Sequence, residues 1–371
     1  MADTKVALIK SHDPYTDPRL LKEIKTLTQH KIQVNMIYWK RKNNHSSILF
    51  ENYTENKFKI NAQGYKSILF WPIWWLYIFY SLIRVNYDII HVLNYNSVIP
   101  ALIVSKIKNT PIIYEIMDTS YDDREIPNFL RKIFVSFDKI FMKLSDAVIL
   151  IDDNQIAEFG GIPNQNLHII YDSAFDVSKK VKVKENSIFT LVFVGVLFKS
   201  RNLNLDKLCK AVNNLKSVKL KIAGYGDLVS EIEKISSQSH EKIEFLGQIS
   251  YEDALKLSFE SDALIVLRDS KPKINQYICG SKLLEAMMCS KPIIVNDKKT
   301  STSEKVRKES CGILINGEDV DEIEKAIIEL RDYPELRKKL GINGRKAYET
   351  KYSWELMEEK LLKLYADLKK V

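Results

Sequence analysis

The chain has 371 residues, which exceeds one ordinary domain core and is typical of two domains of ~100–200 residues each. Hydrophobic residues make up 45% and charged residues 28%, a composition that excludes disordered and collagen-like proteins. The 56 Lys and Arg exceed the 48 Asp and Glu, and the net charge of +8 suits an anionic ligand, nucleic acid or an anionic membrane. The cations are interleaved with acids, whereas a dedicated nucleic-acid binder usually has a sharper basic block.

Cysteine and histidine spacing gives no indication of a metal site. No two of the four cysteines have CxxC spacing, which favours buried thiols in a reducing cytosol over disulfides or metal ligands. The six histidines are scattered and form no HExxH pair. We therefore expect neither a metal nor a cofactor.

Two segments bear on membranes. The first ten residues, MADTKVALIK, lack the apolar segment of ~7–15 residues that a signal peptide needs. Residues 68–83, ILFWPIWWLYIFYSLI, carry no charge but are shorter than the ~20 residues of a spanning helix. They predict either an aromatic-rich core helix or a peripheral membrane contact with tryptophan and tyrosine at the headgroup level.

The first half of the chain alternates apolar strands with helices. Short β-branched segments predict strands at 6–9, 34–38, 89–92, 112–114, 147–151 and 168–171. Helical spacing predicts helices at 17–30 and 97–108. Asp17 before Pro18 is typical of a helix start, because the carboxylate caps the helix and proline suits its first position.

A second series of the same kind follows a charged segment at 177–187, which we interpret as a linker. Strands are predicted at 189–194, 218–222, 243–246, 263–267, 292–295 and 313–315, and residues 334–370 are almost entirely helical. Apolar strands alternating with helices predict two doubly wound α/β domains with parallel sheets. We place these domains at 1–178 and 188–352, and expect 353–371 to be a C-terminal helix that returns to the first domain.

Ligands of such sheets bind at the carboxyl ends of strands, where three segments draw attention. Gly195 ends a predicted strand, and Lys199 and Arg201 follow it at a place suited to a phosphate on a helix N-terminus; the alternative is an ordinary loop with solvated cations. Gly224 lies in AGYGD, which lacks the third glycine of a dinucleotide fingerprint, so NAD binding is not predicted.

The third and strongest segment is NQYICGSKLLEAM, residues 275–287. Gly280-Ser281 predicts a helix start whose free N–H groups would meet a pyrophosphate, and Lys282 adds positive charge in the first turn. Glu285, one turn further on, can accept both hydroxyls of a ribose. Spacing alone equally allows an i,i+3 surface pair of Lys282 and Glu285.

Polar residues also follow the strands of the first half. His12 and Asp13 come after the first strand, His91 lies near the end of the strand at 89–92 with Asn94 after it, and Asp118 comes after the strand at 112–114. All are expected at strand ends and could face one cleft, although a lone histidine in such a place is more often structural.

The order and spacing of several motifs identify a family. They are FVG with a basic residue six positions after the glycine, IAGYGD, SDALIVL, SKLLEAMMCSKPII and CGILINGEDVDEI, joined in the first half by DPRLLKEIKTL, YDIIHVLNYNS and SDAVILID. With them the chain resembles the GT-B fold glycosyltransferases of the group 1 (family 4) type over nearly its whole length. The resemblance implies two Rossmann-like domains facing each other across a cleft, a nucleotide-sugar donor bound mainly by the second, an acceptor bound mainly by the first, and metal-independent transfer with retention of anomeric configuration.

The resemblance assigns roles residue by residue. Arg201 corresponds to the diphosphate-binding basic residue, Glu285 to the second Glu of the E-x7-E motif that contacts the ribose, and Gly195 and Gly224 to glycines lining the donor cleft. His91 falls in the segment that supplies a cleft residue near the sugar. The donor-binding set expected on all these grounds is Gly195, Arg201, Gly224, Tyr277, Gly280, Ser281, Lys282, Leu284 and Glu285. The acceptor-binding set is His12, Asp13 and Asn94, and the catalytic set is Arg201, Lys282, His91 and Asp118.

The chain departs from the family pattern at four places. Tyr277 stands where the first Glu of E-x7-E is expected, Val196 where an Arg often follows the FVG glycine, and Met117-Asp118 where an HD pair is expected. The loop after the first strand also lacks the common double glycine. Val196 and Tyr277 motivate an alternative, a non-catalytic sugar-nucleotide-binding partner in a glycan-assembly complex. A third hypothesis is a basic adaptor for membranes or nucleic acid.

The main hypothesis is a retaining glycosyltransferase for a glycan or lipid-linked acceptor in polysaccharide or glycoconjugate assembly. It would work in the cytoplasm or at the inner face of the cell membrane, with peripheral membrane contact through 68–83 and without nucleic acid.

Overall fold

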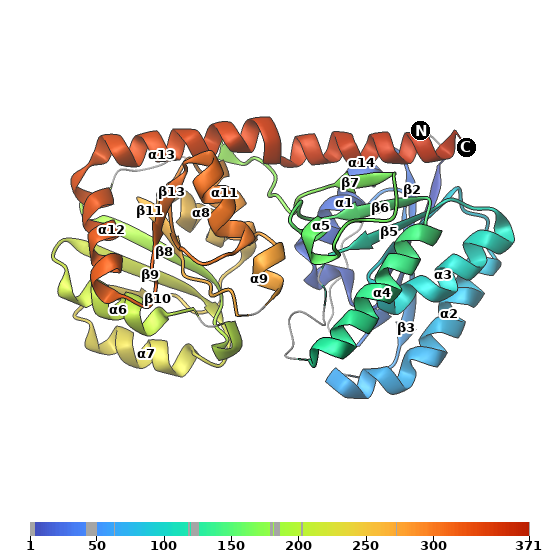
Figure 1. Cartoon of the computed structure of the whole chain (residues 1–371), viewed down its shortest axis with the longest axis horizontal. Helices are drawn as coiled ribbons and strands as arrows, with labels where there is room; N and C mark the ends of the chain where they lie inside the picture. The colour runs from blue at the N-terminus through green and yellow to red at the C-terminus, as the bar shows by residue number, and fades with distance from the viewer. Residues whose placement is uncertain are drawn as a thin grey trace. The chain divides into compact units, whose positions relative to one another are not determined.

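The computed structural model describes residues 4–41, 50–62, 64–117, 119, 126–178, 181, 186–201, 203–271 and 273–370. The chain folds into two compact units (Figure 1). The first comprises Met1–Tyr171 and Met357–Val371, and the second comprises Asp172–Leu356. The second unit thus begins at Asp172, ahead of the linker expected at 177–187.

The first unit is built on a seven-stranded parallel sheet with the order β3-β2-β1-β4-β5-β6-β7. Its strands are β1 (Lys5–Lys10), β2 (Gln33–Lys40), β3 (Tyr53–Lys59), β4 (Ile89–Leu93), β5 (Ile112–Ile116), β6 (Ala147–Leu150) and β7 (Leu167–Ile169). Strand β3 was not predicted, because its sequence YTENKFK is polar. It pairs only with β2 at the sheet edge and therefore needs no continuous apolar sequence.

Helices flank this sheet on the connections between strands. They are α1 (Pro18–Gln29), α2 (Trp71–Ile83), α3 (Tyr95–Lys108), α4 (Asn128–Leu144), α5 (Gln155–Glu158) and the last helix α14 (Trp354–Lys369). The predicted start of α1 is confirmed, since the Asp17 side chain accepts a hydrogen bond from Leu20 N at 3.1 Å. From Met357 onward α14 belongs to this unit, and Glu358 Oε2 accepts a hydrogen bond of 2.9 Å from Thr26 Oγ1 on α1.

The aromatic segment at 68–83 ends a 3-10 helix, η2 (Gly64–Phe70), and then forms α2. Residues 66–83 are long and apolar enough to span a membrane by length and composition alone. Trp74, Ile78 and Leu82, however, are completely buried and pack into the core of the first unit. The segment is therefore a core helix along one side, and its other side is exposed.

The second unit is built on a six-stranded parallel sheet with the order β10-β9-β8-β11-β12-β13. Its strands are β8 (Phe189–Val196), β9 (Val218–Tyr225), β10 (Ile243–Phe245), β11 (Ala263–Val266), β12 (Ile293–Asn296) and β13 (Gly312–Ile315). All six were predicted from the sequence. Together the two sheets confirm the predicted doubly wound α/β architecture.

The helices of the second unit lie between its strands. They are α6 (Leu205–Asn214), α7 (Val229–Gln238), α8 (Tyr251–Glu260), α9 (Ile274–Tyr277), α10 (Ser281–Met288), α11 (Ser301–Glu309), α12 (Val320–Asp332) and α13 (Pro334–Ala347). Leu208 and Val212 of α6 and Ile323 and Ile327 of α12 share one core with the sheet. A π-helical turn at Tyr348–Tyr352 follows α13.

Candidate functional site

The strand order of the second unit marks where a ligand should bind. Chain order runs outward from β8 to β10 on one side and from β11 to β13 on the other, so the topological switch point lies between β8 and β11. In open α/β sheets, ligands bind outside the carboxyl ends of the strands at such a point. The loop after β8 carries Arg201, and the loop after β11 leads to Gly280 and α10.

The packing of β8 against β9 decides which of the glycines near their ends could carry a side chain. Gly195 and Gly224 are paired in register, and a Cβ on Gly224 would lie only 1.9 Å from the Gly195 carbonyl oxygen. Gly226, with φ of +154°, likewise faces the Leu197 carbonyl, 2.2 Å from where a Cβ would lie. The bare Cα atoms of Gly224 and Gly226 are therefore required by the β8–β9 backbone contact, whereas a Cβ on Gly195 would lie 3.8 Å from the Phe193 ring, an ordinary contact. The donor-lining role of Gly195 and Gly224 stays a prediction.

The loop after β8 forms a short 3-10 turn, η4 (Lys199–Arg201). Asp227, from the turn after β9, accepts a hydrogen bond from Lys199 N at 2.8 Å. Its carboxylate therefore fixes the start of η4, the turn that carries Arg201. The cations at 199 and 201 thus come from a turn that is tied to the neighbouring strand end.

The N-terminus of α10 has the geometry of an anion site. Gly280 is its N-cap, with extended backbone (φ −66°, ψ 135°) and no side chain to bond the first-turn N–H groups. Gly280 N itself donates to Thr302 Oγ1 at 3.2 Å, which ties the cap to α11. The N–H groups of Ser281 and Lys282 lie in the first turn, where no carbonyl of the helix itself can accept their hydrogen bonds. They are also at the positive end of the helix dipole.

Lys282 and Glu285 form an ion pair, but it is not the surface pair that spacing allowed. Lys282 Nζ lies 2.7 Å from Glu285 Oε2, and the Glu285 side chain is only 3% exposed. A buried carboxylate is costly unless it is paired, so Glu285 holds the Lys282 ammonium in the first turn of α10. The pair fixes the position of the Lys282 ammonium at the helix end.

A cation that the sequence analysis did not single out completes this site. Arg268 follows β11, and its guanidinium lies against Gly280: a Cβ added there would stand 3.1 Å from Nη1 and 3.2 Å from Cζ. Arginine is charged at any physiological pH and can bond two phosphate oxygens at once. The only signal in the sequence was a basic residue directly after a predicted strand, in LRDS.

The remaining donor candidates divide into one that is buried and one that is not. Leu284 is 2% exposed and its side chain faces the protein interior, and the donor contact expected at this position stays a prediction. Tyr277 ends α9 and is half-buried. The loop that carries them is fixed by Asn275 Nδ2, which donates to the Asp269 carbonyl at 2.8 Å.

In the first unit the catalytic role expected of His91 is corrected by its burial. The residue lies within β4 and has no exposed surface, because both faces of this central strand are covered. His91 Nε2 lies 2.9 Å from Glu115 Oε2, and Nδ1 shares a 2.6 Å hydrogen bond with the Tyr365 hydroxyl of α14. His91 cannot touch a substrate and instead joins the sheet to the last helix.

Glu23, His91 and Glu115 bring three ligand-type atoms together, all buried. Arg19 Nη2 already lies 3.1 Å from Glu23 and 2.7 Å from Glu115. A guanidinium at the centre makes this cluster a charge network, unsuited to a metal ion. Burial raises the pKa of Glu23 well above its usual range, reinforced by Glu115; burial also acts on Glu115, but Arg19 and His91 outweigh it and lower its pKa to about 2.

The acceptor candidates occupy neighbouring loops of the first unit. His12 is exposed, and Asp13 Oδ1 accepts from Tyr15 N at 3.1 Å, so it caps the short helix that follows. Asn94 has φ of 63°, and its Oδ1 accepts from Met117 N at 3.1 Å. Because β1 pairs with β4 in parallel, the loops that follow these strands lie next to each other at the carboxyl end of the sheet. Asp118 lies outside the described residues.

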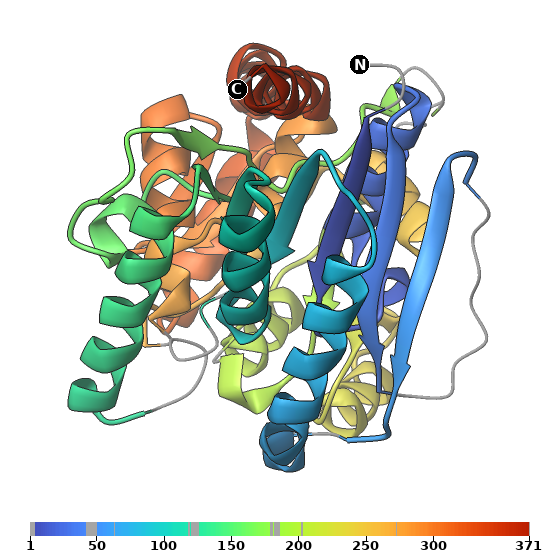
Figure 2. The same cartoon turned by 90° about the vertical axis from the view of Figure 1, so that its right-hand side faces the viewer.

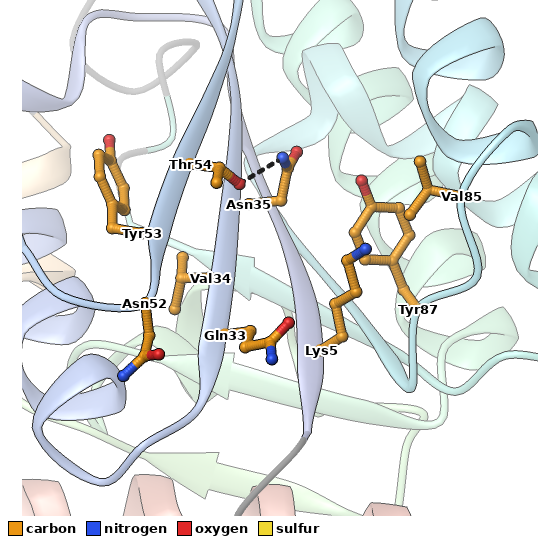
Figure 3. A pocket seen from close by; sticks show the side chains of 9 residues that line it. All are labelled: Lys5, Gln33, Val34, Asn35, Asn52, Tyr53, Thr54, Val85 and Tyr87. Atoms are coloured by element: carbon orange, nitrogen blue, oxygen red, sulfur yellow. Dashed lines mark hydrogen bonds between the residues drawn. The ribbon is translucent and has the colours of Figure 1, made fainter.

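A polar hollow of about 390 Å³ lies elsewhere in the first unit, at the amino ends of β1, β2 and β3 (Figure 3). Lys5, Gln33, Asn35 and Tyr87 are among its lining residues, and Asn35 Nδ2 donates to Thr54 Oγ1 at 2.7 Å. The hollow therefore lies at the opposite end of the sheet from the carboxyl ends of the strands, where ligands usually bind, and we do not assign it to the candidate site.

Comparison with known proteins gives the family of the second unit. Residues 175–347 match the family described as glycosyl transferases group 1. The second unit is a group 1 glycosyltransferase domain. Over 161 residues, 42% of each chain, the chain is 27% identical to a GDP-mannose-dependent monoacylated alpha-(1-6)-phosphatidylinositol monomannoside mannosyltransferase of Corynebacterium glutamicum. It is 26% identical to an uncharacterized glycosyltransferase of Methanocaldococcus jannaschii over 81% of this chain and 79% of the relative.

Solved structures extend the likeness to the whole fold. Sucrose-phosphate synthase from Thermosynechococcus elongatus aligns with a TM-score of 0.75 at 16% identity, covering 98% of this chain and 99% of the other. Anabaena HepE in complex with UDP and glucose aligns with a TM-score of 0.72 at 13% identity, covering 98% and 100%. At such identities the likeness concerns the fold alone. The chain has the GT-B fold.

Proposed function

We propose that this glycosyltransferase binds a nucleoside-diphosphate sugar in its second unit and transfers the sugar, with retention of configuration, to a glycan or lipid-linked acceptor. The observation that carries the proposal is the N-terminus of α10, where Lys282 and Arg268 stand beside first-turn N–H groups under a cap without a side chain. This combination of helix end and cations suits a diphosphate. The GDP-mannose dependence of the Corynebacterium relative and the UDP complex of HepE support that ligand class.

In this proposal the bond from the sugar anomeric carbon to the β-phosphate oxygen breaks, and its electron pair stays on the nucleoside diphosphate. Negative charge grows there as the bond breaks. Lys282, Arg268, Arg201 and the α10 N–H groups stabilise it, and they act more strongly on the transition state than on the bound donor. The acceptor hydroxyl forms the new bond to the anomeric carbon, and its proton passes to the departing phosphate. No side-chain base is required, and Asp118 stays a candidate for orienting the hydroxyl.

Glu285 has two functions in this scheme. Its Oε2 holds the Lys282 ammonium at the helix end, and its second oxygen is the group we assign to the ribose hydroxyls. Metal independence is part of the proposal, because three side-chain cations and a helix end supply the charge that a divalent ion would otherwise bring. Turnover that EDTA leaves unchanged is the expected result, and turnover that EDTA abolishes and Mg²⁺ or Mn²⁺ restores would contradict it.

The acceptor side of the proposal is assigned to the first unit. His12, Asp13 and Asn94 lie in the adjoining loops after β1 and β4 and offer imidazole, carboxylate and amide groups to sugar hydroxyls. We place the enzyme in the cytoplasm, at the inner face of the membrane where a lipid-linked acceptor would be found.

The proposal is tested by incubating the protein with UDP-, GDP-, ADP- and dTDP-sugars and a mixture of glycan and lipid-linked acceptors. Release of the nucleoside diphosphate together with a product of unchanged anomeric configuration, seen by NMR, is expected for one donor class. Binding of a donor without turnover across the whole panel would favour the alternative, a non-catalytic partner in a glycan-assembly complex. Tyr277, in place of an expected Glu, is the residue that motivates that alternative.

A further inference from the structure

Three helices of the first unit, α2, α3 and α4, lie side by side on one flank of the sheet, with α3 between the other two (Figures 1 and 2). Their outward side is unusually apolar for a protein surface. Leu76 of α2 is 69% exposed, Ile107 of α3 61%, and Phe129 and Phe137 of α4 64% and 51%; Leu69, 78% exposed, precedes α2 in η2. Monomeric soluble proteins seldom expose contiguous apolar areas of this extent without a partner. We call this side the α2–α4 face.

The charge on the same helices is entirely of one sign where it meets solvent. Helices α2, α3 and α4 contain six Lys and Arg and a single acidic residue, Asp138. Asp138 is 2% exposed and accepts a 2.5 Å hydrogen bond from the Tyr114 hydroxyl, so it belongs to the interior. Over the whole chain the ratio of cations to acids is only 56 to 48. The α2–α4 face is thus both apolar and locally cationic.

The exposed side chains come from one side of each helix. On α2 the tryptophans turn inward: Trp74 Nε1 donates to Ser97 Oγ at 3.2 Å, and Trp75 Nε1 donates to the Asn96 carbonyl at 2.9 Å. The outward positions are Ile73, Leu76 and Tyr80 instead. On α4 an apolar hollow of about 290 Å³ is lined by Ile133, Phe137 and Ile140, with Lys132 at its edge. Aliphatic groups flanked by exposed lysines suit the boundary between acyl chains and anionic headgroups.

The geometry points to the α2–α4 face as a docking surface for an anionic lipid bilayer. A second copy of the chain fits poorly, because a symmetric contact would bring the exposed Lys106, Lys132 and Lys143 of one copy against the same lysines of the other. An anionic bilayer instead meets both features, since it takes up the apolar side chains and attracts the lysines. This docking needs no donor and no turnover, so it stands or falls separately from the proposed glycosyl transfer. It also moves the expected contact from residues 68–83 alone to a face in which α4 contributes most.

The test is sedimentation of the full chain with phosphatidylcholine vesicles, with and without phosphatidylglycerol. Binding is expected only with phosphatidylglycerol, and high salt is expected to release the protein, as it would not release a spanning helix. The double variant Lys132→Glu and Lys143→Glu should bind at least about tenfold more weakly. The variant Phe129→Ser with Phe137→Ser should also bind more weakly while keeping the thermal melting temperature, because both rings are exposed.

The matched control is Lys234→Glu with Lys325→Glu, which changes net charge equally on exposed residues of the second unit. It should bind vesicles like the natural chain. An equal loss in the control, or no binding of the natural chain to anionic vesicles, would overturn the proposal. A dimer seen by sedimentation equilibrium would also overturn the proposal if the Phe129 and Phe137 changes dissociated it and left vesicle binding unchanged.

Discussion

The guanidinium of Arg268 lies directly against the Cα of Gly280, so closely that a Cβ there would stand 3.1 Å from Nη1. Arg268 ends the segment after β11, and Gly280 caps α10. The contact therefore places a permanent positive charge beside the N–H groups of a helix end. Lys282, held by Glu285, adds a second charge one residue inside that helix.

Replacing Arg268 by Ala should weaken the binding of nucleoside diphosphates by about 10–100-fold, the loss expected when charge-assisted hydrogen bonds worth ~1.5–3 kcal/mol are removed. Titration calorimetry with UDP and GDP measures the change. Lys256→Ala, at an exposed position on α8, serves as the control and should bind like the natural chain. Equal affinities for all three proteins would remove Arg268 from the site.

Gly280→Ala tests the same contact without removing a charge. The backbone at 280 suits any residue, so the variant should fold with a nearly unchanged melting temperature. The new methyl group would push the Arg268 guanidinium away from the cap by a few tenths of an ångström, and we expect diphosphate binding that is weaker by up to about tenfold. A folded variant with full affinity would show that the position of Arg268 beside the cap has no bearing on the ligand.

The Lys282–Glu285 pair should be visible in stability as well as in binding. Lys282→Met leaves a buried carboxylate without its partner and should lower the free energy of unfolding by ~3 kcal/mol. The double variant with Glu285→Gln should lose much less than the sum of the two single variants, because each single change already breaks the pair. Urea unfolding of the four proteins gives the coupling, and additive effects would contradict a direct pair.

The buried network of the first unit predicts a pH dependence of stability. The pKa of Glu23 is raised above its ordinary value. The contribution of protonated Glu23 to the free energy of unfolding is therefore complete below about pH 4.5, and it is lost as pH rises toward the pKa in the folded chain. Glu23→Gln should therefore be near neutral at pH 4 and increasingly stabilising toward pH 8.

Glu115 provides the opposite case. The pKa of Glu115 is lowered to about 2 in the folded chain. Its charge therefore stabilises the fold wherever the pH is above the ordinary pKa of a glutamate, and this stability is lost as pH falls toward 2. Glu115→Gln should be destabilising at pH 7, with a difference that shrinks in acid. Urea midpoints measured across this range test both residues, and parallel pH profiles for the two variants would contradict the assignment.

Much of the fold followed from the sequence, since buried parallel strands must be apolar throughout and helices must have one apolar face. The polar edge strand β3 lacks that signature and was missed. The start of α10 was predicted because Gly280-Ser281 is a local signal. The contact of Arg268 with that cap was not, because it depends on where the loop after β11 returns. His91 was misplaced for the same kind of reason: its partners Glu115 and Tyr365 come from a neighbouring strand and from the last helix.

The central claim is that α10 and its cations hold the donor diphosphate, and a crystal structure of the chain with bound UDP or GDP tests it most directly. We predict phosphate oxygens within hydrogen-bond distance of the Ser281 or Lys282 N–H groups, with the Arg268 guanidinium on the same diphosphate. A nucleotide seated anywhere else in the molecule, with the first turn of α10 left in solvent, would contradict the account.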